Sequence, residues 1–316
     1  MFYAEVYLSA RIGDLISMDE KFATTKPMNS SKCLAETLSL CDVHLFRFKE
    51  GEVRFLMAPN LFLPDEWTEA LLIGLAGHYT GRSTLGTVME IGIGSGIVPL
   101  CLVNVMRYSV DRYIGIDINP VACEVSRLNL SLGCPRLSYR ILSADILANN
   151  RPALAEDVDL VLANVPQMPM VSNDYIDRNN YYLAKPYQGE EGEVDILLRD
   201  FGLELIYNVL EFSVPPLRER AGAVIFTLSG RCGAEQMHTL VSSIELRVRI
   251  VHTIRVRQDV TMNIEPLISA EKAHKTRCEF FANPEDFDGI SAAEAIEQMR
   301  RGEPVYHDLH VVLAEI

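Results

Sequence analysis

From residue 87 to residue 316, short runs of apolar residues alternate with segments in which apolar residues recur every three or four positions. The short runs are typical of buried strands, and the spaced pattern is typical of helices. Strands are expected at residues 87–96 (a run that ends in glycines), 112–119, 138–145, 158–166, 222–230, 246–258 and 306–316. Helices are expected at residues 97–109, 120–133, 196–212, 234–244 and 291–302. A short apolar piece, CEFF at 278–281, is a further candidate strand.

This alternation predicts an α/β fold with a seven-stranded, mostly parallel sheet that is covered by helices on both faces. The run 246–258 alternates apolar and polar residues, as an edge strand does. The ends of two helices also carry signals. Pro120 and Gly133 are suited to the start and the end of one helix, and Ser291 with Glu294 forms a capping box at the start of another.

The residues before this region have a mixed pattern, and we expect residues 1–84 to form a small N-terminal subdomain that recognises the substrate or covers the site. Within it, residues 66–79 have helical spacing. Residues 85–316 are expected to form the catalytic domain. Inside that domain, a polar insertion at 168–195 is too long for an ordinary connection, and we expect it to lie over the substrate.

Composition and charge exclude several classes of function. The chain has 316 residues and a net charge of −14, with a pI of about 5.0. This argues against a general nucleic-acid binder, which needs a basic surface. No apolar run reaches the roughly 18 residues that a membrane span needs. The seven cysteines form no CxxC pair and no metal-ligand spacing, so we expect a reduced, cytoplasmic protein without a metal site.

The strongest chemical signal is EIGIGSG, residues 90–96, between the first strand and the first helix of the alternating region. Glycines let such a turn fold tightly and let a ligand approach the backbone, and the N–H groups at the helix start favour an anionic group. The three glycines are Gly92, Gly94 and Gly96. A tight turn without a ligand is the simpler alternative. Among ligands, the dinucleotide motif Gly-x-Gly-x-x-Gly would need a glycine at Ile97 and has no place for Glu90, so the spacing favours S-adenosylmethionine (SAM).

Acidic residues end the second and third strands. Asp117 can accept both ribose hydroxyls of an adenosine, with Ile118 beside it in the same site. Alternatively, Asp117 caps the next helix, although Asn119 can do this instead. Asp145 can meet the adenine amino group or cap a helix. Because the carboxyl ends of parallel strands share one edge of the sheet, we expect the glycine loop and both acids to converge there.

The fourth strand ends in the sequence NVPQ, which is Asn164, Val165, Pro166 and Gln167. A turn explains the proline but does not need two amides. We therefore expect these four residues to form the catalytic part of the site, where the methyl acceptor binds, with Asn164 also contacting the cofactor.

Together these motifs resemble class I SAM-dependent methyltransferases over roughly residues 87–230. In those enzymes, an Asn-Pro-Pro-aromatic motif after the fourth strand marks methylation of amide or amino nitrogens, as in the release-factor glutamine methyltransferases. Asn164 and Pro166 match this motif, whereas Val165 and Gln167 depart from it. The chain is more similar to the N-terminal methyltransferase region of plant methionine S-methyltransferases, which carry Ile-Pro-Gln here. That similarity includes residues 61–67, 115–132, 199–206, 224–233 and 278–281.

The resemblance implies a one-step displacement in which the enzyme aligns the reacting atoms and excludes water, with S-adenosylhomocysteine as the product. In the NPPY-type relatives, the Asn side chain and the next carbonyl receive N–H groups of the acceptor, and the matching groups here are Asn164 and the Val165 carbonyl. A thioether has no N–H to give, whereas a guanidino or amide nitrogen has. We therefore expect methylation of a side-chain sulfur or nitrogen of a free amino acid or small derivative.

Two other functions stay open. One is a protein N-methyltransferase acting on a glutamine or similar side chain, and the other is a SAM-binding scaffold without chemistry. The expected partner is a small amino-acid acceptor, with no membrane and no nucleic acid, and a homo-oligomer is left open. Side chains expected near the acceptor are Trp67, Tyr181, Tyr182, Glu191 and Arg231, the last of which could pair with an acceptor carboxylate or lie on the surface.

Overall fold

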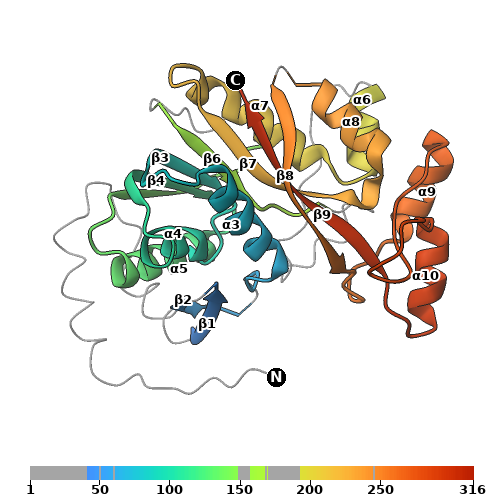
Figure 1. Ribbon diagram of the computed structural model, residues 1–316, viewed down its shortest axis with the longest axis horizontal. Coiled ribbons are helices and arrows are strands. Elements are labelled where there is room, and N and C mark those ends of the chain that lie inside the picture. Colours follow the sequence, from blue (N-terminus) through green and yellow to red (C-terminus); the bar gives the residue numbers. More distant parts are fainter. Residues whose placement is uncertain are drawn as a thin grey trace.

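Seven strands form one sheet in the order β5-β4-β3-β6-β7-β9-β8 (Figure 1). The computed structural model describes residues 41–49, 51–59, 61–148, 157–167, 169, 193–244 and 246–316. The strands are β3 (Thr84–Ile91), β4 (Ser109–Asp117), β5 (Tyr139–Ser143), β6 (Leu160–Ala163), β7 (Ala223–Ser229), β8 (Arg247–Arg257) and β9 (Tyr306–Glu315). Along the sheet, each neighbouring pair of strands from β5 through β4, β3 and β6 to β7 is parallel. Strand β9 is antiparallel to both of its neighbours, β7 and β8. The predicted seven-stranded, mostly parallel sheet and the edge position of 246–258 are confirmed.

The order of the strands opens a crevice at one edge of the sheet. The chain runs outward from β3 to β4 and β5, and then crosses back to β6 on the other side of β3. The connections that follow β3 and β6 therefore leave the sheet in opposite directions. Open α/β sheets bind their ligands in the crevice between two such connections. Glu90 lies at this point, between Gly115 of β4 and Leu162 of β6.

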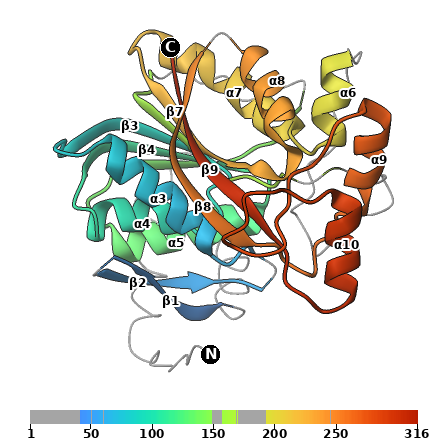
Figure 2. The same cartoon turned by 45° about the vertical axis from the view of Figure 1, so that its right-hand side comes forward.

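Both faces of the sheet are buried under helices (Figures 1 and 2). On one face lie α3 (Glu66–His78), α4 (Ile97–Asn104) and α5 (Pro120–Gly133), which share a core with Val88 and Leu162. On the other lie α6 (Glu193–Asp200), α7 (Glu204–Arg218), α8 (Ala234–Ser242), α9 (Glu265–His274) and α10 (Ala292–Arg300). Met89 and Val161 belong to this second core. Neighbouring residues of one strand thus enter opposite cores, as the period of two requires.

The described part of the predicted N-terminal subdomain packs against the sheet. Leu71 and Leu75 of α3 share a core with Val311 of β9, and a Cβ atom on Gly74 would lie 2.5 Å from Val311 Cγ1. The hairpin of β1 (Asp42–Phe48) and β2 (Gly51–Met57) is fixed to α5 by the Asn129 side chain. This amide accepts from Leu56 N at 2.7 Å and donates to Leu56 O at 2.8 Å. The boundary near residue 84 stays a prediction.

Three predicted elements differ from the structure. The helix at 97–109 ends at Asn104, because the chain turns at Arg107 (φ +62°) to enter β4. The helix at 196–212 is interrupted at Gly202 (φ +73°), whose N–H bonds to Arg199 O, and it becomes α6 and α7. Residues 278–281 form two isolated bridges rather than a strand. In addition, α9 was not among the predicted helices.

The helix caps predicted for α5 and α10 are confirmed. Ser291 and Glu294 form the predicted capping box at the start of α10, and Asn119 caps α5 by accepting from Val121 N at 2.9 Å. In the described part of the chain, none of the helices combines the length and the apolar character that crossing a membrane requires.

Candidate active site

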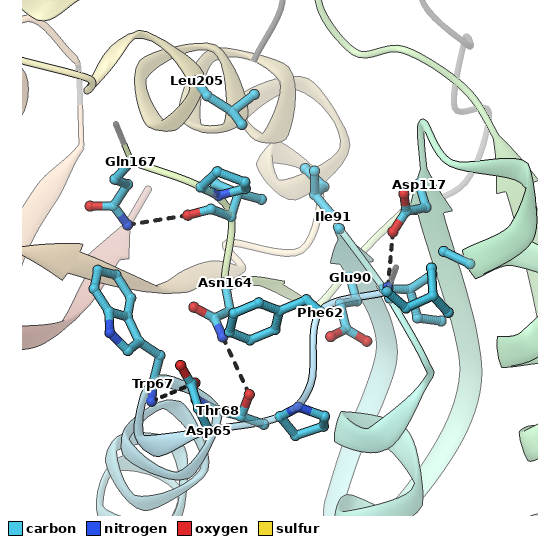
Figure 3. Close-up of a pocket in the computed structure, with 18 of the residues that line it drawn as sticks. Phe62, Asp65, Trp67, Thr68, Glu90, Ile91, Asp117, Asn164, Gln167 and Leu205 are labelled. Atoms are coloured by element: carbon cyan, nitrogen blue, oxygen red, sulfur yellow. Dashed lines mark hydrogen bonds between the residues drawn. The ribbon is translucent and has the colours of Figure 1, made fainter. Parts of the chain in front are cut away.

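A pocket lies at the carboxyl ends of the strands, between the glycine loop after β3 and the NVPQ segment after β6. Its further walls come from the start of α3, the end of β8 and the start of β9. Figure 3 shows Glu90 and Asp117 on one side of this pocket and Trp67, Asn164 and Gln167 on the other. We call these two sides the cofactor side and the acceptor side.

The glycine loop takes a left-handed backbone at each of the three predicted glycines, which are Gly92, Gly94 and Gly96. Two of these positions matter most for the pocket. A Cβ on Gly92 would lie 3.1 Å from Val165 Cγ1, so the loop packs directly against the NVPQ segment. A Cβ on Gly94 would meet no atom within 4 Å, so this part of the loop faces open space in the pocket. The loop therefore has room for a ligand beside its backbone.

Asp117 holds the glycine loop in place. One carboxylate oxygen accepts from Gly94 N at 2.9 Å, and the other accepts from Asn119 N at 2.8 Å. Burial raises the pKa of this carboxyl, and the backbone N–H groups oppose the shift. The alternative role of Asp117 as the helix cap is taken by Asn119. Both Ile118 and Asp145 line the same pocket, and Asp145 also accepts from Leu147 N at 2.9 Å.

Glu90 lies at the bottom of the cofactor side and is only 3% exposed. The Tyr113 hydroxyl donates to its carboxylate at 2.5 Å. Burial raises the pKa of Glu90 to about 8, the Tyr113 bond opposes this, and the charge of Asp117 adds to it. Tyr113 was not predicted as a site residue, because it stands within an apolar run and has the appearance of a core residue.

The NVPQ segment is bound to the end of β7 through its two amide side chains. Gln167 Nε2 donates to Thr227 O at 2.8 Å, and Gln167 Oε1 accepts from Ser229 N at 2.8 Å. The Gln167 amide thus continues the backbone pairing of β6 with β7, which ends at Ala163 and Phe226. This geometry indicates that Gln167 positions the loop. It does not single out a contact of this amide with the acceptor.

Asn164 lies between two hydroxyl groups. Its Oδ1 accepts from Thr227 Oγ1 at 2.8 Å, and its Nδ2 makes a long contact of 3.5 Å with Thr68 Oγ1 (Figure 3). Thr68 belongs to the first turn of α3, so the acceptor side is closed by an element from the N-terminal part of the chain. Neither threonine was predicted as a site residue.

Arg231 is buried, with 3% exposure, so the surface alternative is wrong. Its Nε donates to Ser229 Oγ at 2.7 Å, and Nη2 donates to Gln167 O at 3.0 Å. Nη1 approaches Gln258 Oε1 at 3.3 Å, and the guanidinium lies 5.9 Å from the Trp67 ring. Burial lowers the pKa of Arg231 to about 10, so it is a cation at neutral pH. The acceptor side therefore has a fixed positive charge in its wall.

Two more groups complete the acceptor side. The His307 ring lies 5.9 Å from that of Trp67, and burial, then the charge of Arg231, hold the pKa of His307 well below its usual range. His307 is therefore neutral at physiological pH. Asp65 caps α3 by accepting from Trp67 N at 2.9 Å. The residue is exposed, but partial desolvation by the surrounding pocket wall raises the pKa of its carboxyl to about 6, against the effect of the Trp67 and Thr68 N–H groups. Both residues line the pocket, and neither was predicted as a site residue.

The remaining predicted acceptor residues, Tyr181, Tyr182 and Glu191, lie outside the described residues, as does most of the 168–195 insertion. Among the residues that are described, no three His, Cys, Asp or Glu side chains are grouped as a metal ion would need.

Comparison with known proteins places this pocket in context. No protein-family model matches the chain. Methionine S-methyltransferase of Zea mays is 25% identical over 299 residues, which cover 87% of this chain and 27% of that protein. The Arabidopsis thaliana protein of the same name is 23% identical over 320 residues, which cover 92% of this chain and 29% of that protein. The chain therefore spans less than a third of the length of these relatives.

A shorter relative comes from Methanocaldococcus jannaschii and is provisionally named a protein N5-glutamine methyltransferase. It is 24% identical over 204 residues, which cover 65% of this chain and 90% of that protein. These relatives confirm the resemblance to SAM-dependent methyltransferases that the motifs indicated.

Solved structures were also compared. The ribosomal protein L11 methylase of Lactobacillus delbrueckii subsp. bulgaricus matches with a TM-score of 0.43 and 14% identity, covering 67% of this chain and 93% of that one. A T. thermophilus 16S rRNA N2 G1207 methyltransferase was solved with AdoMet (SAM) and guanosine. It matches with a TM-score of 0.45 and 15% identity, covering 67% of this chain and 48% of that one.

Proposed function

We propose that the chain transfers the methyl group of SAM to a sulfur or nitrogen atom in the side chain of a free amino acid or small amino-acid derivative. The observation that carries the proposal is that one pocket joins the glycine loop and Asp117 to the Asn164 amide. Similarity to the plant methionine S-methyltransferases, which covers 87% of this chain, supports the same function.

The cofactor side fits SAM in three respects. The backbone at Gly94 faces open space, and Ser95 Oγ is buried without a hydrogen-bond partner among the described residues, so it can bond to a ligand. The carboxylate of Asp117 favours a cationic ligand, whereas Glu90, with its pKa raised to about 8, is mostly protonated at neutral pH and can serve as a hydrogen-bonding group. When bound, SAM would supply a methyl group on a positively charged sulfur. The Asp117 carboxylate has about four lone-pair positions, and those that its backbone N–H partners leave open can accept ribose hydroxyls.

The acceptor side would orient the nucleophile. Asn164 Oδ1 keeps one lone pair beside the bond from Thr227, and with the Val165 carbonyl it can accept N–H groups of a nitrogen acceptor. The positive charge of Arg231 favours the carboxylate of a free amino acid, and Trp67 offers an apolar wall. Pro166 and Gln167 fix the loop that carries these groups. Closing the pocket removes water from the reacting atoms.

The location and the division of the chain follow as lesser proposals. We propose a cytoplasmic location, which is supported by five buried cysteines that form no disulfide among the described residues: Cys101, Cys123, Cys134, Cys232 and Cys278. We also propose that residues 1–84 and the 168–195 insertion contribute to acceptor recognition, because Asp65, Trp67 and Thr68 already line the pocket.

A screen with methyl-labelled SAM tests the proposed function. The chain is incubated with each common amino acid in turn, and the products are identified by mass spectrometry, which names both the acceptor and the methylated atom. We expect label in one amino acid or a few related ones. Label in added proteins with none in free amino acids would favour the protein N-methyltransferase instead. Calorimetry that finds no binding of SAM or S-adenosylhomocysteine would exclude both.

A further inference from the structure

Thr227, near the end of β7, links the two amides of the NVPQ segment. Its hydroxyl donates to Asn164 Oδ1 at 2.8 Å, and its carbonyl accepts from Gln167 Nε2 at 2.8 Å. We propose that Thr227 is a positioning residue that sets the orientation of the Asn164 amide toward the acceptor. This inference rests on the proposed function, because it assigns Asn164 to the acceptor site.

The location of Thr227 suits this role. It is fully buried and stands one residue after Phe226, the last β7 residue that pairs with β6. Beyond this pair, the NVPQ segment leaves the sheet, and the ladder no longer fixes its backbone. Side-chain bonds to β7 take over this function, and Thr227 supplies two of them. Thr227 therefore contributes both to the position of the segment, together with Ser229, and to the orientation of its first amide.

The Asn164 amide needs such a partner. An amide group rotates about a broad, roughly two-fold torsion, and a rotation of 180° exchanges its acceptor oxygen for its donor nitrogen. On the other side of the amide, Thr68 Oγ1 is 3.5 Å from Nδ2, a length at which a hydrogen bond is weak. The shorter bond with Thr227 is therefore the main restraint on this torsion, and it holds Oδ1 against β7. One lone pair of Oδ1 is used by Thr227, and the second remains for a ligand.

Thr227→Val removes the hydroxyl with little change in volume, and Thr227→Ser keeps it. For the acceptor that the screen identifies, we expect Thr227→Val to lower kcat by about tenfold, the scale of one lost hydrogen bond. Thr227→Ser should stay within about twofold of the wild type, and the SAM dissociation constant should not change in either variant. A matched control is Ser213→Ala in α7. It also removes a buried hydroxyl, which donates to Val209 O at 2.6 Å, at a position that does not line the pocket.

A double-mutant cycle separates positioning from a general loss of structure. In an Asn164→Ala background, Thr227→Val should cause no further loss of kcat, because the group that it orients is gone. The same loss in both backgrounds, or wild-type kcat in Thr227→Val, would overturn the inference. If Thr227→Val does not fold, as judged by thermal unfolding, Thr227→Cys takes its place in the cycle.

A readout that does not require activity separates this inference from the proposed function. The side-chain amide signals of Asn164 can be assigned in a ¹⁵N–¹H spectrum by their absence in Asn164→Ala. We expect them to shift in Thr227→Val and not in Ser213→Ala. If they do not shift, the inference is wrong, whatever the activity. If they shift while the wild-type chain methylates nothing, the contact stands but the proposed function fails, and with it the catalytic part of the inference.

Discussion

The two sides of the pocket are built in different ways. On the cofactor side, one carboxylate, Asp117, holds the glycine loop through backbone N–H groups. On the acceptor side, side chains from β7, α3 and the end of β8 hold one another: Arg231 bonds to Ser229 and Gln258, and Thr227 bonds to Asn164. The cofactor side thus depends on one carboxylate that binds backbone groups, whereas the acceptor side depends on side chains that bind one another.

This difference predicts which amino-acid substitutions each side of the pocket can tolerate. A loop held by backbone groups tolerates many side chains as long as its glycines and its carboxylate remain. A network of buried polar side chains has members that depend on one another, so the loss of one leaves others unsatisfied. Substitutions on the acceptor side should therefore affect stability and turnover together. Substitutions on the cofactor side should mainly affect SAM affinity.

The largest effect is expected for Arg231→Met. The change leaves Ser229 Oγ, Gln258 Oε1 and Gln167 O without their buried donor, and we expect a loss of about 2–4 kcal/mol in the free energy of unfolding together with a loss of activity. Chemical denaturation measures the first and the labelled assay the second. The control is Arg300→Met, whose exposed ion pair with Glu265 should contribute less than about 1 kcal/mol. Equal stability of the two variants would contradict a network held by Arg231.

Asn164→Ala should lower turnover by about 10- to 100-fold while the SAM dissociation constant stays within a few-fold, because the lost contact is to the acceptor. Steady-state kinetics on the identified acceptor and calorimetry with SAM measure the two quantities. Near-normal turnover would remove Asn164 from the acceptor site.

Asp117→Ala should have the opposite pattern. Loss of the carboxylate frees the glycine loop and removes the expected ribose contacts, so SAM binding should weaken by about 1–3 kcal/mol. Turnover at saturating SAM should change less than the affinity. If both variants lower affinity and turnover equally, the two sides of the pocket do not act separately, and the comparison fails.

The same difference explains how much could be predicted from the sequence. The convergence of Gly92, Gly94 and Asp117 on one pocket could be predicted, because they stand at fixed distances from strand ends and the order of the strands brings such ends together. Gly96 does not line the pocket, because it packs against Ser126 of α5. Asn164 was found by the same logic. Thr68, Thr227 and His307 were not predicted, because a buried threonine or histidine has no local signal of its partner. Arg231 was found, but its burial depends on contacts with β8 and the NVPQ segment that no local pattern encodes.

A pH series tests the cofactor side further. Burial raises the pKa of Glu90 to about 8, above its ordinary value of 4.5, so the folded state binds this proton more tightly than the unfolded state. Stability should therefore fall as the pH rises from 4.5 to 8, by at most about 1.4 kcal/mol per pH unit. Denaturation of Glu90→Gln at several pH values should show a shallower slope in this range. An identical slope would mean that Glu90 does not take up a proton on folding.

The smallest effect is expected at Asp65, on the acceptor side. Partial desolvation raises the pKa of this exposed residue from 3.8 to about 6, so stability should fall slightly as the pH rises through this range and then level off. Asp65→Asn keeps a good helix cap and removes the charge, so its melting temperature should equal that of the wild type near pH 4 and exceed it slightly at pH 7. Asp65→Ala, which loses the cap as well, should melt below the wild type at both pH values. If Asp65→Asn also melts lower at pH 7, the ionised carboxylate stabilises the start of α3. In that case the acceptor side, like the cofactor side, would be held by a carboxylate that binds backbone N–H groups.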